Sequence, residues 1–148
     1  VIAVDPDPAK RETAQRYGAA LAVDPGAADA MRPIVKASGN EVLGVVDFVG
    51  SESSSALGVG IVRRGGTVVI VGLFGGEFRT PVPMFPLKSM AVRGSYVAGL
   101  NELRELVALA QRVTLPEIPL TLRPLAEVNA SLEDLAAGRV VGRVVLLP

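Results

Sequence analysis

The strongest constraint on the fold is a series of short, uninterrupted apolar runs separated by segments with helical spacing. Such runs are typical of strands covered on both faces of a parallel sheet, whereas strands with one solvated face alternate apolar and polar residues. Strand-like and helix-like segments take turns along the chain, which predicts a doubly wound α/β fold. The expected strands are Val1–Val4, Ala20–Val23, Val45–Val49, Thr67–Val71, Ala91–Tyr96 and Val140–Leu147.

Capping residues mark the first helix most clearly. Asp7 suits an N-cap, Pro8 suits the first helical position, and Gly18 is a suitable stop after about Tyr17. In the second helix, Pro33 predicts a late start or a kink. The other expected segments are helices over Ala27–Ala37, Ser51–Arg64, Asn101–Gln111 and Leu125–Ala137, and a Pro/Gly-rich loop over Gly75–Pro86.

Composition excludes several classes of function. The 148 residues suffice for one domain with a core, and 15 basic residues balance 15 acidic ones without a basic block for nucleic acid. No apolar run reaches the roughly 18 residues of a membrane span and no signal-peptide pattern is present, so we expect a cytoplasmic protein. The sequence has no Cys and no His, which excludes a thiolate nucleophile, a His base and a His/Cys metal site within these residues.

An acidic residue, Asp5, directly follows the first apolar run in VIAVDPDPAK. In a dinucleotide-binding Rossmann unit, an acid about 20 residues after a Gly-rich turn hydrogen-bonds the ribose. Counting back from Asp5 passes beyond Val1, so we expect the first strand and its Gly-rich turn to lie outside this sequence. Asp5 alone is also compatible with a solvated turn residue, or with the ribose-binding acid of a methyltransferase.

The absent strand has a structural consequence. It is central in the usual strand order, between the strands that correspond to Val1–Val4 and Val45–Val49. We therefore expect these two strands not to pair directly. Their open edges predict that the physical protein contains a preceding segment, or a complementing chain, that fills the gap.

Five segments, in this order, resemble the cofactor domain of medium-chain zinc-dependent alcohol dehydrogenases. They are VIAVDPDPAKRETAQRYGAALAVDP, VVDFVG, RRGGTVVIVGLFGG, RGSYVAGLNELRELVALA and LAEVNASLEDLAAGRVVGRVVLLP. The resemblance covers nearly all of the chain and implies NAD as the cofactor, because a carboxylate at Asp5 accepts ribose hydroxyls and repels a 2′-phosphate. Lys10 matches a basic residue near the adenosine ribose, with a solvated lysine as the alternative. Arg11 beside it weakens the preference for NAD.

The resemblance also implies cofactor contacts at the ends of later strands, with a core strand end and a turn glycine as the alternative. The matching residues are Phe48, Val49 and Gly50 beside adenine and its ribose; Val71, Gly72 and Leu73 along the nicotinamide; Ser95, Tyr96 and Val97 across its carboxamide; and Arg143 at the pyrophosphate, with Arg139 as its alternative.

Three other groups of residues attract attention. Ser53–Ser55 fall in the first turn of an expected helix and resemble no nucleophile turn. Glu133 and Asp134 are adjacent in a helix and face different directions, so they do not form a paired-carboxylate site. Met84 and Phe85 either anchor a loop or line the substrate side of the pocket.

The parent enzyme implied by the resemblance transfers hydride between an alcohol and an aldehyde or ketone at a catalytic zinc. Its zinc ligands, Cys and His in the family, lie outside these residues, so we expect no catalytic residue here and no activity of this chain alone. In dimeric relatives edge strands pair, which predicts a homodimer or homotetramer through Ala91–Tyr96. The alternatives are a zinc-free, usually NADPH-dependent quinone or enoyl reductase, a methyltransferase domain, and a non-catalytic nucleotide-sensing module.

Overall fold

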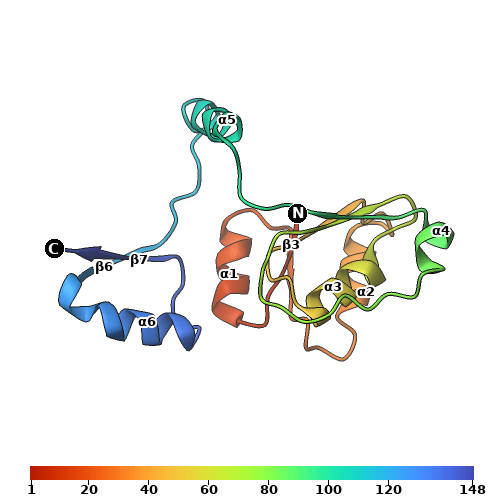
Figure 1. Ribbon diagram of the computed structural model, residues 1–148, viewed down its shortest axis with the longest axis horizontal. Coiled ribbons are helices and arrows are strands. Elements are labelled where there is room, and N and C mark those ends of the chain that lie inside the picture. The colour runs from red at the N-terminus through yellow and green to blue at the C-terminus, as the bar shows by residue number, and fades with distance from the viewer. The chain divides into compact units, whose positions relative to one another are not determined.

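Strands and helices alternate along the computed structural model, which describes all 148 residues (Figure 1). The chain divides into two compact units, Val1–Arg104 and Glu105–Pro148. The first unit contains β1 (Ile2–Val4), α1 (Pro8–Arg16), β2 (Leu21–Val23), α2 (Met31–Ala37), β3 (Gly44–Asp47), α3 (Glu52–Ile61), β4 (Thr67–Ile70), α4 (Met84–Lys88) and β5 (Ala91–Gly94). Helix α5 (Leu100–Ala110) spans the boundary. The second unit contains β6 (Leu120–Pro124), the 3₁₀ turn η1 (Leu125–Glu127), α6 (Val128–Ala136) and β7 (Arg143–Leu147).

All strand pairings are parallel, and they form three sheets: β1–β2, β3–β4–β5 and β6–β7. Within the largest sheet, Val45, Val68 and Val92 lie in register across the three strands. Strand β1 pairs with β2 and not with β3, so β1 and β3 each keep one edge unpaired within the chain. The predicted α/β class with parallel strands is confirmed, and so is the lack of direct pairing between the strands at Val1–Val4 and Val45–Val49.

Two hydrophobic clusters form the core of the first unit. The first contains the buried residues Val23, Ala30, Ile34 and Ile61, and Ile2 and Val45 pack against it. It therefore joins the β1–β2 sheet to β3 through the helices α2 and α3, which lie side by side (Figure 1). The second cluster contains Val59, Val62, Val68 and Met90, and it fixes α3 and the start of β5 on β4.

Glycine in α3 is explained by this packing. A Cβ at Gly58 would lie 3.3 Å from a methyl carbon of both Val45 and Val68, so a side chain there would require these valines to move slightly, and glycine lets α3 approach the sheet closely. The C-terminal end of α3 is also fixed by Lys88. Its Nζ donates to the carbonyl oxygens of Val59 at 2.7 Å and Val62 at 3.1 Å, groups that have no further turn of α3 to bond to.

Local capping signals predicted the helix starts well. Asp7 caps α1 by accepting a hydrogen bond from the Ala9 N–H at 2.8 Å, and Gly18 follows the helix with φ +95°. Helix α2 starts late, at Met31, with Pro33 in its first turn where a missing N–H costs little. Ser51 and Ser54 form a capping box at the start of α3, which confirms the placement of Ser53–Ser55 in a first helical turn.

The structure corrects four expectations. The loop expected over Gly75–Pro86 ends early, because α4 starts at Met84. A strand, β6, was not predicted, since its sequence LTLRP is short and ends in Pro. The last strand starts at Arg143 rather than Val140, because the turn at Gly142 with φ +85° precedes it. The expectation that both faces of each strand are covered is also wrong for β3, because the Val46 side chain is 53% exposed.

None of the helices is both long enough and apolar enough to span a membrane.

Candidate functional site

The residues singled out in the first unit follow the carboxyl ends of parallel strands, where open α/β sheets bind their ligands. Asp5 follows β1, and Asp24, which the sequence analysis did not identify, follows β2. The other predicted segments follow β3, β4 and β5, and all of them lie just outside these shorter strands: Phe48–Gly50, Val71–Leu73 and Ser95–Val97.

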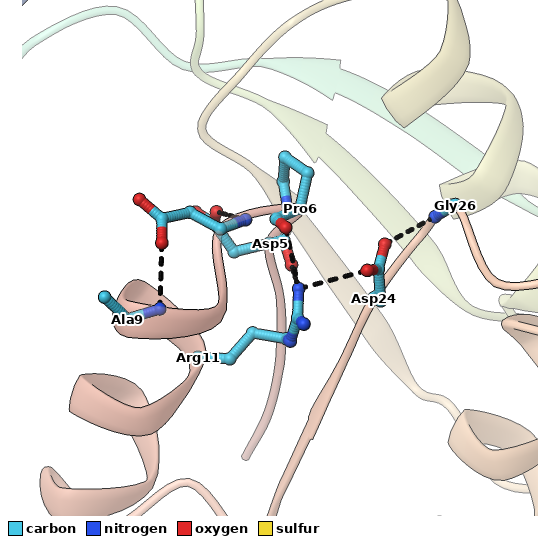
Figure 2. Close-up of polar contacts among 7 residues, drawn as sticks. Asp5, Pro6, Ala9, Arg11, Asp24 and Gly26 are labelled. Atoms are coloured by element: carbon cyan, nitrogen blue, oxygen red, sulfur yellow. Dashed lines mark hydrogen bonds and ion pairs between the residues drawn. The ribbon is translucent and has the colours of Figure 1, made fainter. Parts of the chain in front are cut away.

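Asp5 is held in place but keeps binding capacity. Its N–H donates to the Val23 carbonyl at 3.2 Å, which ties it to the end of β2. Its Oδ1 accepts a hydrogen bond from the Asp7 N–H at 2.8 Å, while Oδ2 has no partner in the chain (Figure 2). The carboxylate is half-buried and forms no ion pair. A carboxylate oxygen without a partner is suited to accept a hydroxyl hydrogen.

The two basic residues near Asp5 differ in their contacts. Lys10, in the first turn of α1, is half-buried, and its side chain forms no hydrogen bond or ion pair within the chain. Arg11 instead forms an ion pair with Asp24, with Nη1 and Oδ2 3.3 Å apart. Sequence reasoning did not identify Asp24, because its partner is 13 positions away and only the β1–β2 pairing brings the two together.

A second carboxylate that sequence reasoning missed, Asp47, ends β3. The residue is 6% exposed, yet both of its oxygens are satisfied. Oδ1 accepts from the Val49 N–H at 3.0 Å and the Gly50 N–H at 2.9 Å. Oδ2 accepts from the hydroxyls of Ser54 at 2.8 Å and Ser55 at 3.2 Å. An acid inside the apolar run VVDFVG was the available signal, since a buried carboxylate requires several donors nearby.

These contacts decide the protonation state of Asp47. Burial by itself would raise the pKa of its carboxyl group, because it disfavours the charged form. The hydrogen bonds from Gly50, Ser54, Val49 and Ser55 outweigh burial and hold the pKa below its ordinary value of 3.8. The group is therefore an anion at neutral pH, and it serves to organise the turn between β3 and α3.

That turn is bonded to the segment that follows β4. The Gly72 N–H donates to the Asp47 carbonyl at 3.0 Å, and the Phe74 N–H donates to the Val49 carbonyl at 3.0 Å. The approach is so close that a Cβ at Gly50, which has φ +67°, would overlap the Gly72 carbonyl. A Cβ at Gly72 would likewise overlap the backbone of Val49. Both glycines are therefore required by the contact between these two backbones.

The surface around these two turns is apolar and exposed. Phe48, Val49 and Leu73 have exposed side chains, with Phe48 and Leu73 among the most exposed large apolar residues of the chain. A shallow depression lies beside them, between the start of α3 and the segment after β4. Its lining residues are Ser51, Glu52, Ser53, Ala56, Phe74 and Gly75.

The segment after β5 is fixed at its start and strained at its end. The Ser95 N–H donates to the Ile70 carbonyl at 2.9 Å, which keeps Ser95 beside the end of β4. Val97 adopts φ +47°, a left-handed conformation that β-branched residues rarely adopt. Tyr96 and Val97 are both exposed.

Arg143 and Arg139 belong to the second unit. Arg143 is the first residue of β7, is exposed, and its Nη1 donates only to the neighbouring Gly142 carbonyl at 3.0 Å. Arg139 pairs with Asp134, as does Arg123, each at 2.7 Å. Hydrogen bonds from Arg123 and then Arg139 hold the pKa of Asp134 below its ordinary value. The Asp134 carboxylate is thus engaged by two arginines, and Glu133 and Asp134 do not form a paired-carboxylate site, as expected from the sequence.

Residues 1–112 match the family model described as zinc-binding dehydrogenase. The chain belongs to this family. The resemblance to medium-chain zinc-dependent alcohol dehydrogenases is thereby confirmed. An alcohol dehydrogenase of Geobacillus stearothermophilus is 33% identical over 148 residues, and an NAD-dependent alcohol dehydrogenase of Sulfurisphaera tokodaii is 26% identical over 149 residues. These matches cover 99% and 100% of the chain and 43% of each relative, so the chain spans about two fifths of their length.

Solved structures of zinc-binding dehydrogenase relatives show the same fold. The alcohol dehydrogenase of Aeropyrum pernix matches with a TM-score of 0.88 and 35% identity, over 100% of this chain and 42% of its own. A cobalt- and zinc-bound thermostable alcohol dehydrogenase of Pyrobaculum aerophilum matches with a TM-score of 0.77 and 25% identity, over the same shares. The Rossmann-type α/β class is therefore confirmed.

The side chains present fit a dinucleotide in part and a zinc ion not at all. The unpartnered Asp5 oxygen is the type of group that a ribose hydroxyl bonds to. No cluster of three or more His, Cys, Asp or Glu residues could hold a metal ion. Any zinc ligands of a Cys or His type would therefore come from outside these 148 residues.

Proposed function

We propose that this chain is the NAD-binding part of a zinc-dependent alcohol dehydrogenase, an oxidoreductase that moves hydride between an alcohol and an aldehyde or ketone. Membership of the zinc-binding dehydrogenase family supports the reaction class. The observation that carries the choice of cofactor is Asp5, which follows β1, forms no ion pair, and keeps one carboxylate oxygen open.

In this proposal each strand end has its own task. Asp5 accepts the ribose hydroxyls, with Lys10 nearby in the first turn of α1. Phe48–Gly50 lies along adenine and its ribose, where the anchored turn at Asp47 offers an exposed apolar surface. Val71–Leu73 and Ser95–Val97 present backbone groups to the carboxamide, and Arg143 donates to the pyrophosphate.

The nicotinamide, when bound, supplies the acceptor and donor of hydride. This chain contributes binding and orientation, and none of its residues is catalytic. We propose that the zinc ligands and the proton relay belong to the remaining part of the full-length protein, because this chain has no Cys or His. These 148 residues alone are then expected to be inactive.

The unpaired edges of β1 and β3 also support a further part of the full-length protein. Both strands pack on one hydrophobic cluster, through Ile2 and Val45, yet they are not hydrogen-bonded to each other. We propose that a parallel strand from elsewhere in the protein pairs with both, followed by the Gly-rich turn that holds the phosphates. Without such a strand, the backbone N–H and C=O groups along the open edges of β1 and β3 would lack hydrogen-bond partners, which would destabilise both sheets.

We further propose that β5 pairs with its copy in a homodimer or homotetramer. Within the chain β5 pairs with β4 on one side, and its other edge is open. The substrate would be a small alcohol or carbonyl compound, with no nucleic acid or membrane partner. Location in the cytoplasm stays a prediction.

Titration of the full-length protein with NAD and NADP tests the proposal, together with a metal assay by mass spectrometry. We expect NAD to bind at least tenfold more tightly than NADP, because a carboxylate at the ribose repels a 2′-phosphate, and we expect bound zinc. Preference for NADP in a zinc-free protein would instead indicate the quinone or enoyl reductase. Binding of NAD without any turnover would indicate a sensing module.

The methyltransferase alternative is not supported by the fold. Such a domain typically ends in an antiparallel hairpin, whereas β6 and β7 are parallel. The match to the zinc-binding dehydrogenase family model covers residues 1–112 and points the same way.

A further inference from the structure

The guanidinium group of Arg11 is bonded on the side of the β1–α1 turn that faces β2. Its Nη1 donates to the backbone carbonyls of Asp5 at 2.7 Å and Pro6 at 2.8 Å, and lies 3.3 Å from Asp24 Oδ2 (Figure 2). The Arg11 side chain is 21% exposed, which is low for an arginine near the surface. One nitrogen thus contacts three oxygens of this chain.

Asp24 is itself fixed in position. Its other carboxylate oxygen, Oδ1, accepts a hydrogen bond from the Gly26 N–H at 2.8 Å, which closes a turn after β2 (Figure 2). The Asp5 N–H bond to the Val23 carbonyl places the ends of β1 and β2 next to each other. Asp24 is therefore held close to the β1–α1 turn before any ligand binds.

Arg11 contacts both Asp24 and Asp5, but in different ways. Arg11 forms an ion pair with Asp24 and bonds the main chain of Asp5, but it forms no ion pair with the Asp5 carboxylate. A guanidinium paired with Asp5 would neutralise the charge proposed to meet the ribose. A guanidinium released toward the ribose would attract a 2′-phosphate, as arginines do in NADP-binding Rossmann domains.

We propose that Asp24 is a specificity-determining residue: it captures Arg11, and thereby leaves Asp5 as the unneutralised charge that selects NAD over NADP. This inference rests on the proposed function. It assigns to Asp24 a role through Arg11 and without contact to the nucleotide.

The test is the ratio of the dissociation constants for NADP and NAD, measured with the full-length protein. The variant Asp24→Asn keeps an acceptor for the Gly26 N–H and removes the charge that holds Arg11. We expect this ratio to fall about tenfold, the scale of one charge-assisted hydrogen bond. Asp29→Asn is the matched control, because Asp29 is an exposed acid of the same loop, 3.8 Å from Arg32, and we expect its ratio to be unchanged.

A second background shows whether the effect acts through Arg11. In a protein that carries Arg11→Leu, the further change Asp24→Asn should leave the ratio unaltered, since no guanidinium remains to be released. An equal fall in that background would overturn the proposal and indicate a general charge effect. Where thermal unfolding shows that Asp24→Asn is not folded, Asp24→Ser replaces it, because the serine hydroxyl can still bond the Gly26 N–H.

The outcomes distinguish the two levels of inference. A wild-type protein that binds neither nucleotide would overturn the proposed function and this inference with it. A wild-type protein that prefers NAD, with the same ratio in Asp24→Asn, would overturn only the role of Asp24.

Discussion

Asp5 and Asp47 occupy equivalent places in the chain, at the ends of parallel strands, yet the structure treats them differently. Asp47 is 6% exposed, and its carboxylate accepts four hydrogen bonds from its own chain. Asp5 is half-buried, and its carboxylate accepts one, from the Asp7 N–H. A carboxylate whose lone pairs are all used can only hold a turn together, whereas one with an open oxygen can bind a ligand. The difference separates a structural acid from a candidate binding acid.

The largest expected effect is on folding, at Asp47. Asp47→Ala leaves two backbone N–H groups and two hydroxyls without their acceptor, and we expect it to lower the free energy of unfolding by roughly 3 kcal/mol. Urea denaturation of the full-length protein measures this loss. Asp5→Ala is the matched variant and should change stability by less than about 0.5 kcal/mol. Equal losses at the two sites would contradict the distinction between them.

The next effect is on binding, at Asp5. Asp5→Asn keeps an acceptor for the Asp7 N–H but removes the charge, so we expect NAD to bind roughly tenfold to a hundredfold more weakly while the unfolding free energy stays constant. Isothermal titration calorimetry of the full-length protein gives the affinity. Unchanged NAD affinity would show that Asp5 is a solvated turn residue.

A smaller effect on stability is expected at Ser54, which helps to hold the Asp47 carboxylate. The Ser54 hydroxyl donates to Asp47 Oδ2 at 2.8 Å and accepts from the Ser51 N–H at 3.0 Å, so Ser54→Ala removes both an Asp47 contact and part of a helix cap. We expect a loss of about 1 kcal/mol in unfolding free energy. The neighbouring Ser53→Ala, at an exposed position, should have little effect in the same chemical denaturation.

The smallest effect concerns pH. The pKa of Asp47 is lower in the folded protein than its ordinary value of 3.8, so its contribution to stability is present above that value and is lost as pH falls through the folded pKa. We expect unfolding free energy to decline below about pH 4. Asp47→Asn should flatten this part of the profile in denaturation measured between pH 2 and 6, and an unaltered slope would assign it to other carboxylates.

Much of the fold could be predicted from local signals. Asp7, Pro8 and Gly18 bound α1 because capping depends on a few neighbouring residues. The run TVVI of Thr67–Ile70 forms the central strand of the largest sheet, with Val68 fully buried in the core. Strand β6 was missed because LTLRP is a weak strand signal by itself and is stabilised by its pairing with β7. Leu120 pairs with Arg143, which lies 23 positions later in the chain.

The candidate site was predictable only in outline. The positions of Asp5 and of the glycines follow from strand ends, which the sequence marks. Gly50 and Gly72 gave no sign that their segments approach each other, although the Gly72 backbone excludes a Cβ on Gly50 and the Val49 backbone excludes a Cβ on Gly72. Asp24 was not identified either, since its significance depends on Arg11 being held by carbonyls of a different turn.

The sequence by itself determined the alternation of strands and helices, the absence of Cys and His chemistry, and the acid at the end of the first strand. These are properties of composition and of short segments, and they need no partner. Only the tertiary structure decided which carboxylate is satisfied, which is open, and which acid holds Arg11. The physical reason is that hydrogen-bond satisfaction depends on donors brought together by strand pairing, and the linear sequence does not record that proximity.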